Sequence, residues 1–331
     1  MARPWSLLAL ALLAVGCRSA RADASPEDAP AGPIAATPIA EPSFAGVEAA
    51  ATVAQSLAAP SLAEHRATAT RIYEATPPPP CPKGMAHLGR FCVDRYEAHL
   101  VLVDAPGGAE TPHPPEHRPP EGRRFEARSA AGMKPQAYVS RVEAALACKN
   151  ADKRLCSFGE WRRACGSRRG KRYPYGWGGK RGACNTGKKH LLHEIFGERP
   201  WSYEQFNDPK LSLEPGYLAA SGAHPECATE QGVFDMNGNL HEWVSSTVTE
   251  DFVERLEEED VERVDQPWVV GNGMFLGGFY STTDQHGPGC LYTTIAHEPT
   301  YHDYSTGFRC CRDAVIEEPK SVKRAAKAPA P

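Results

Sequence analysis

Residues 232–244 read GVFDMNGNLHEWV, and this stretch is the most informative part of the sequence for the fold. The NGN at 237–239 consists of turn-forming residues, and a tight turn there can aim successive backbone carbonyls at one point. Two interpretations stay open. The stretch binds a hard cation, or Asp235 and Asn237 only stabilise the turn while Trp243 packs in the core.

Two helix starts precede this stretch. SRVE at 140–143 precedes AALACKNADK, and SFGE at 157–160 precedes WRRACGS. Both fit the capping box, in which the Ser and Glu side chains reciprocally satisfy free amides of the first turn. The KRLC between them is a short buried connector, so Cys148 and Cys165 are expected on two helices that face a common core.

The remaining segments contain little that predicts long regular elements. Residues 91–102 favour a strand, and the Pro- and His-rich residues 104–123 favour a surface loop. Residues 166–231 are loop-rich. The acidic run at 250–263 indicates a solvated helical face rather than a site. A strand-like WVVGNGMFLGGFY then leads into GGFYSTTDQHGPGC at 277–290.

The first residues, MARPWSLLALALLAVGC, predict export. Their apolar run is too short to span a bilayer and is typical of a signal peptide, residues 1–16, and LAVGC resembles a bacterial lipobox that places a lipid on Cys17. Residues 17–80 are Ala/Pro-rich and predict a disordered tether. A domain at 81–314 and a disordered basic tail at 315–331 complete the expected organisation. The lipid anchor predicts a cell-envelope location, at the outer membrane, facing the periplasm or the surface.

Composition narrows the class of protein. A formal net charge of −4 with 24% charged residues gives no electrostatic case for nucleic acid as a partner. Of the 11 cysteines, one would carry the lipid, which leaves an even number. In an oxidising compartment these favour disulfides over metal ligands.

Several motifs, in this order, resemble one family: DKRLCSFGEWRRACGS, YPYGW, CNTG, GVFDMNGNLHEW, GGFY and GFRCC. The family is the sulfatase-modifying factor, or formylglycine-generating enzyme, superfamily. The resemblance implies an α+β fold: a single domain, related to C-type lectins, with low regular secondary structure and disulfide staples. It also implies five pairs, each stabilising by about 2–4 kcal/mol: Cys81–Cys92, Cys148–Cys310, Cys156–Cys311, Cys165–Cys290 and Cys184–Cys227.

The family enzyme uses a cysteine pair to bind copper(I), since soft thiolates select that ion. The matching positions here hold Thr282 and Gly287, so copper is not expected and no catalytic residue is assigned. We expect instead a groove that binds a peptide, glycan or protein ligand without turnover, lined by Tyr280, Thr282, Thr283, Asp284, His286 and Tyr301. The alternative is a formylglycine-generating or related metal-dependent oxidase. Histidines 286, 297 and 302 would be its imaginable iron ligands, although their spacing favours separate groove residues.

The resemblance also implies structural calcium. Its ligands would be the side chains of Asp235 and Glu242 and the carbonyls of Gly238 and Leu240, which suit a hard cation. A second family site would begin at Asn185 and Thr186, but no acidic partner for it is evident downstream. A third interpretation of the whole chain is an envelope scaffold without a ligand.

Overall fold

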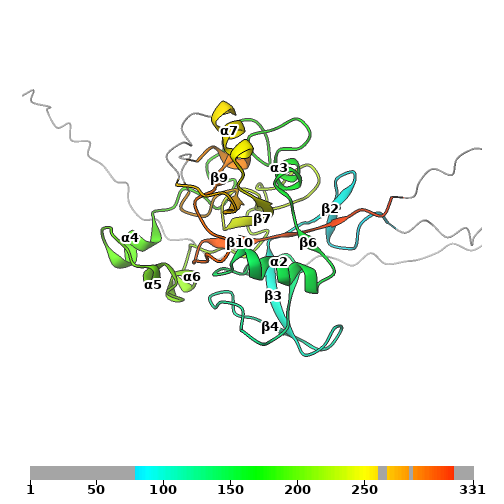
Figure 1. The fold of residues 1–331 in the computed structure, drawn as a ribbon, viewed down its shortest axis with the longest axis horizontal. Helices are drawn as coiled ribbons and strands as arrows, with labels where there is room; N and C mark the ends of the chain where they lie inside the picture. The colour runs from blue at the N-terminus through cyan, green and yellow to red at the C-terminus, as the bar shows by residue number, and fades with distance from the viewer. Residues whose placement is uncertain (1–78, 260–266, 283–285, 317–331) are drawn as a thin grey trace, which may run out of the picture. The chain divides into compact units, whose positions relative to one another are not determined.

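The computed structural model describes residues 79–259, 267–282 and 286–316. Short strands and short helices alternate along this part of the chain (Figure 1). The strands are β1 Met85–His87, β2 Phe91–Asp94, β3 Ala98–Val103, β4 Glu110–Pro112, β5 Phe125–Ser129, β6 Arg154–Leu155, β7 His241–Thr247, β8 Gly273–Leu276, β9 Thr293–Thr294, β10 Thr306–Phe308 and β11 Cys310–Asp313. The helices are α2 Arg141–Asn150, α3 Phe158–Gly166, α4 Leu191–Phe196, α5 Tyr203–Phe206, α6 Lys210–Leu213 and α7 Glu250–Glu259, with a 3-10 turn at Gly289–Leu291.

These strands form three small sheets, ordered β1-β2-β11-β6, β10-β7-β8-β9 and β4-β3-β5. All neighbours are antiparallel except β10 and β7, which run parallel, with Gly307 opposite Glu242. This parallel pair joins the GFRCC motif near the end of the domain to the NGNLHEW motif. Figure 1 shows α4, α5 and α6 together at one end and β2 at the other.

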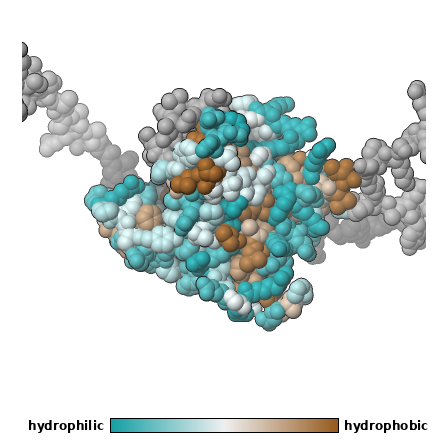
Figure 2. Space-filling model, viewed as in Figure 1, coloured by the Kyte–Doolittle hydropathy of each residue, from teal (hydrophilic) through white to brown (hydrophobic). Residues whose placement is uncertain are grey.

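Helices α2 and α3 supply apolar side chains that pack against the strands. Trp161 of α3 packs in a cluster with Met274 and Leu276 of β8. Ala144 and Ala147 of α2 pack in a second cluster with strands β3 and β5. The face shown in Figure 2 is largely hydrophilic with scattered apolar spots, as expected of a folded domain whose apolar residues are mostly inside.

The two expected helix starts are confirmed. Ser140 and Glu143 form a complete capping box at α2, and Ser157 and Glu160 form one at α3. The strand expected over 91–102 is two strands, β2 and β3, and the region 166–231 contains the short helices α4–α6 among its loops. The acidic run begins as α7, whose Phe252 and Val253 are buried, so this helix has an apolar face as well as a solvated one.

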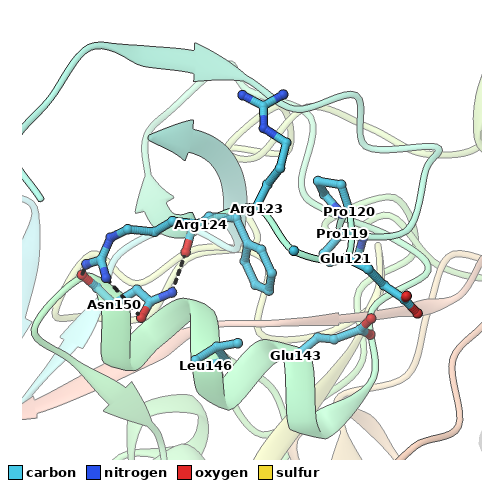
Figure 3. Close-up of a pocket in the computed structure, with 10 residues that line it drawn as sticks. Pro119, Pro120, Glu121, Arg123, Arg124, Glu143, Leu146 and Asn150 are labelled. Carbon is cyan, nitrogen blue, oxygen red and sulfur yellow. Dashed lines mark hydrogen bonds between the residues drawn. The ribbon is translucent and has the colours of Figure 1, made fainter. Parts of the chain in front are cut away.

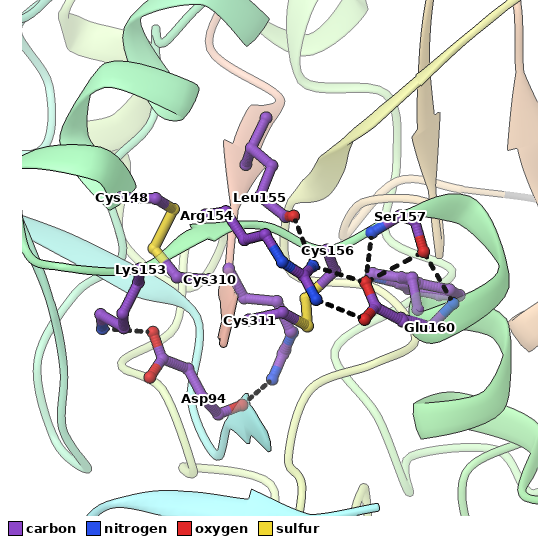
Figure 4. The surroundings of a disulfide bond; sticks show 12 residues. Asp94, Cys148, Lys153, Arg154, Leu155, Cys156, Ser157, Glu160, Cys310 and Cys311 are labelled. Atoms are coloured by element: carbon purple, nitrogen blue, oxygen red, sulfur yellow. Dashed lines mark hydrogen bonds and ion pairs between the residues drawn. A yellow bond between two sulfur atoms is a disulfide. The ribbon is translucent and has the colours of Figure 1, made fainter. Parts of the chain in front are cut away.

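Five disulfides connect the elements, and they are the pairs that the family resemblance implies: Cys81–Cys92, Cys148–Cys310, Cys156–Cys311, Cys165–Cys290 and Cys184–Cys227. Figure 4 shows the neighbouring Cys310 and Cys311 of β11 bound to Cys148 of α2 and to Cys156, which precedes α3. The Lys153–Asp94 ion pair, at 2.7 Å, lies beside them. One strand therefore holds both helices.

The observed architecture is the expected α+β domain with low regular secondary structure and several disulfides. The expected signal peptide, Cys17, the tether and the tail beyond residue 316 lie outside the described residues. No helix among the described residues is long and apolar enough to cross a membrane.

Candidate functional site

A pocket of about 680 Å³ lies where the 277–290 stretch meets the α4–α5 loop and β7. Its lining is mostly aromatic and imidazole side chains, with one acid and one arginine. The aromatic and charged part of the lining consists of His190, Arg199, Trp201, Phe206, His241, Phe275, Phe279, His286, Tyr292, His297, Tyr301, Asp303 and Tyr304.

Three of the expected groove residues line this pocket: Thr282, His286 and Tyr301. Tyr280 does not. It is fully buried among Tyr217, Phe279 and Tyr304, and burial raises the pKa of its hydroxyl well above the ordinary value. The expectation that Tyr280 faces the groove was therefore wrong. Thr283 and Asp284 lie outside the described residues.

His241 is the most buried imidazole in the pocket wall. It lies between Phe275 and Tyr292, with ring centroids at 4.6 and 5.4 Å. Burial lowers the pKa of His241 well below its ordinary value, and the neighbouring His297 and His286 lower it further. Its buried Nδ1 atom has no hydrogen-bond partner among the described residues. The imidazole is therefore neutral, and its aromatic neighbours hold it in the pocket wall.

His297 and Asp303 complete the polar part of the wall. The His297 ring stacks on Tyr301 at 3.9 Å, and burial lowers the pKa of His297. Asp303 accepts a 2.6 Å hydrogen bond from the Tyr301 hydroxyl and others from Ser305. Its carboxylate is thus positioned by its own neighbours. His302 lies elsewhere, with Nδ1 at 2.8 Å from the Asn207 side-chain oxygen, and does not line the pocket.

The positions that match the family's copper cysteines are structurally engaged. The Thr282 hydroxyl accepts a 2.6 Å hydrogen bond from the Phe279 amide, and Gly287 is buried. Gly278 has φ +73°, and a Cβ there would lie 2.6 Å from Thr282, which explains a glycine at this turn. Every cysteine among the described residues is in a disulfide, including Cys290, so this part of the chain offers no thiol.

The residues expected to bind calcium surround a buried ion pair. Glu242 is engaged on both oxygens: Arg309 donates to it at 2.6 Å from Nε and from Nη2, and Trp161 donates at 2.7 Å. Asp235 accepts a 2.6 Å hydrogen bond from the Gly222 amide. Glu97, which was not expected here, accepts hydrogen bonds from the Asn239 side chain and the Leu240 amide.

Three buried carboxylates therefore share one guanidinium. Burial raises the pKa of Glu97 well above its ordinary value, and Asp235 and Glu242 raise it further. Burial also raises the pKa of Asp235 to about 6. No described residue donates a hydrogen bond to the carbonyl of Gly238 or Leu240. In charge and ligand type this donor set fits a hard divalent cation, although Glu242 would have to share such an ion with Arg309.

At the second expected calcium site, at Asn185 and Thr186, the neighbouring backbone carbonyls are bound by a lysine side chain. The Asn185 amide donates at 2.9 Å to the Tyr217 carbonyl, and the Lys188 ammonium donates to the carbonyls of Gly216 and Tyr217. Burial lowers the pKa of Lys188. A side-chain cation therefore already binds the Tyr217 carbonyl that Asn185 contacts. Among the described residues, no group of three or more His, Cys, Asp and Glu side chains is arranged to hold a metal.

Sequence reasoning missed the pocket residues His190, Arg199, Trp201 and His241. Three of them come from the loop-rich region, where no periodicity predicts which side chains turn inward. His241 lies inside the NGNLHEW motif, directly before Glu242 in a strand, so alternation along β7 places the two on opposite faces. That alternation was the signal available for His241.

A second hollow lies between residues 119–125 and α2 and is open to solvent (Figure 3). Arg124 and Asn150 bond to each other there, and Glu143 belongs to the α2 capping box and to an ion pair with Arg118. Because Arg124, Asn150 and Glu143 already have partners, this hollow is the weaker candidate site.

The fold and pocket define a disulfide-rich α+β domain with one aromatic, histidine-rich pocket next to a buried charge network. Residues 92–314 match the family model of the sulfatase-modifying factor enzyme 1-like domain, and the chain belongs to that family. No curated protein matches the chain.

Solved structures with similar folds include PvdO from Pseudomonas aeruginosa, with 15% identity over 67% of this chain and 80% of that one, at a TM-score of 0.39. CarF has 17% identity over 67% of this chain and 86% of that one, at 0.36. Treponema denticola variable protein 1 has 12% identity over 70% and 99%, also at 0.36.

Proposed function

We propose that this protein is a lipid-anchored envelope protein whose pocket beside Thr282 binds a peptide, glycan or protein ligand without turning it over. The observation that carries the proposal is the cysteine inventory. The ten described cysteines form five disulfides, so none is left as a thiolate for copper(I). The anchor on Cys17 and a location at the outer membrane, facing the periplasm or the surface, belong to the same proposal.

The pocket wall supports binding. Aromatic rings offer large contact area at a low cost in side-chain entropy. Calcium at Asp235, Gly238, Leu240 and Glu242 would have a structural role, since it would balance the excess of buried carboxylates.

The first experiment counts thiols. The chain from residue 17, carrying Cys17→Ser and exported to an oxidising compartment, is denatured without reductant, alkylated and weighed by mass spectrometry. We expect no alkylated cysteine. Alkylation at Cys165 and Cys290 together would contradict the proposal, because it would return thiols to the neighbourhood of the pocket.

The second experiment tests the pocket itself with a glycan array and a peptide library as probes. Trp201→Ala, which removes part of the pocket wall, should abolish the signals that the parent chain gives. The matched control is Trp177→Ala, since Trp177 is 59% exposed and lies outside the pocket. Equal signals from both variants would show that the pocket is not the binding site.

A metal-dependent oxidase is the second candidate function. The observation behind it is that His241, His286 and His297 line one pocket, and imidazoles bind transition metals. Since the described side chains are not arranged to hold a metal, the rings would have to move to bind one. Stoichiometric copper or iron in protein purified without a His tag, together with oxygen consumption, would establish this candidate instead.

A further inference from the structure

A basic face surrounds the turn between β1 and β2, far along the chain from the pocket motifs. Residues 162–172 contain six Lys and Arg residues and no acid. Arg163 lies in the last turn of α3, and Arg168 and Arg169 follow the helix and are exposed. These side chains and His87 line an open cleft of about 320 Å³.

Two of these guanidinium groups converge. The Nη2 atoms of Arg163 and Arg168 lie 3.5 and 3.8 Å from the point where a Cβ on Gly89 would stand. One acid also lines the cleft: Glu230, which forms an ion pair with Lys171 and is attracted to Arg169. Asp313 is paired with Arg154. Three arginines share this one acid, so the cleft keeps an excess of positive charge, which indicates a site for an anion. Guanidinium groups match phosphate oxygens in a bidentate manner.

The ends of the described domain lie at the same face. The Ala314 amide donates at 2.9 Å to the Arg90 carbonyl, and the Val315 amide donates at 2.9 Å to the Pro80 carbonyl. Val315 and Ile316 are 57% and 55% exposed. Exposed apolar side chains next to arginines suit a surface that presents phosphates above an apolar layer.

We propose that this face, formed by the β1–β2 turn with Arg163, Arg168 and Arg169, docks on the phosphate headgroups of an anionic membrane. Because the whole chain has a net charge of −4, the remaining surface is repelled and the domain acquires one orientation. The inference goes beyond the proposed function and does not require a lipid on Cys17.

The test uses the chain from residue 17 with Cys17→Ser, so that no lipid anchors it. Vesicles of phosphatidylcholine alone are compared with vesicles containing roughly one third phosphatidylglycerol in a cosedimentation assay. We expect sedimentation with the anionic vesicles only, and a steep loss of binding as salt is raised. Binding to both kinds of vesicle, to neither, or independent of salt would overturn the proposal.

A matched pair of variants locates the contact. The triple change Arg163→Glu, Arg168→Glu and Arg169→Glu should weaken vesicle binding roughly tenfold or more. The control reverses three exposed lysines elsewhere, Lys134→Glu, Lys149→Glu and Lys189→Glu, which alters the net charge equally and should leave most of the binding. Equal losses would show that only net charge matters. Binding to soluble polyphosphate without binding to vesicles would assign the cleft to a free phosphate ligand instead.

Discussion

Arg309 is fully buried and binds both oxygens of Glu242, while its Nη1 atom donates at 3.0 Å to the Asp94 carbonyl. The guanidinium thus connects β7 to the last residue of β2. Glu97 and Asp235 depend on the same positive charge, because Arg309 lowers the pKa of both carboxyls against the effect of burial.

Arg309→Met should therefore destabilise the domain by about 3–5 kcal/mol, since it leaves buried carboxylates without their counter-ion. The free energy of unfolding is measured by urea titration at neutral pH. Arg312→Met is the matched control. Arg312 lies three residues further along the chain, in β11, and is exposed, so this substitution should cost no more than about 0.5 kcal/mol. Similar midpoints for the two variants would contradict the assigned role of Arg309.

Asp235 predicts a pH dependence of stability. Its pKa is raised to about 6 in the folded domain, so the unfolded chain releases the proton more readily. The sign follows: relative to Asp235→Asn, the parent domain without calcium should lose stability as pH rises from about 4 to about 6. Calcium should restore stability above pH 6 in the parent and much less in the variant.

The control for this series is Asp152→Asn. Asp152 also has a positive φ, 54° against 58° for Asp235, but it is exposed. The stability difference between Asp152→Asn and the parent measures what the loss of an exposed carboxylate does at each pH, and it is subtracted from the Asp235→Asn series. A flat difference for Asp235→Asn after this subtraction would show that this carboxyl titrates normally in the fold.

Local sequence signals specified some elements and not others. The capping boxes at Ser140 and Ser157 were readable because every interaction in them lies within four residues. The pocket residues could not be identified from the sequence, because Trp201 and His241 come to line one pocket only through contacts made by the whole fold. Tyr280 shows the same limit: an aromatic next to a glycine pair fits a groove or a core equally well, and tertiary packing decides.

The loop at 184–188 and the loop at 214–217 provide a test at the level of elements. Lys188→Met removes the charged donor to the Gly216 and Tyr217 carbonyls, and should cost about 1 kcal/mol. It should also speed amide hydrogen exchange in the loop that follows Tyr217. Lys189→Met is the neighbouring control, since Lys189 is exposed, and exchange that changes equally in both variants would rule out this role for Lys188.

Disulfide connectivity makes a prediction for the whole molecule. The bridges Cys148–Cys310 and Cys156–Cys311 span 162 and 155 residues, but they are nearly parallel. When one is closed, the other closes only a small ring, because its partners are already held together. Opening a single bridge should therefore release much less chain entropy than its span implies.

Replacing both pairs by alanine should thus cost more than the sum of the two separate replacements, by roughly 1 kcal/mol on chain-entropy grounds. Thermal unfolding of the parent, the two single-bridge variants and the double variant completes the cycle. The comparison bridge is Cys81–Cys92, whose span is 11 residues and whose loss should add independently. Simple additivity for the parallel pair would contradict the argument.

The adjacent cysteines of β11 also make oxidation a check on folding. Successive residues of a strand point to opposite faces, and Cys310 lies in the cluster with α2 while Cys311 lies in the cluster with α3. If β11 paired one residue out of register, each thiol would face the wrong helix and neither bridge could close. A misaligned chain therefore keeps free thiols, which can attack other disulfides by thiol–disulfide exchange, whereas a correctly aligned chain has none left among these four. The two bridges therefore close only on the correctly aligned strand, and once closed they prevent β11 from slipping out of register.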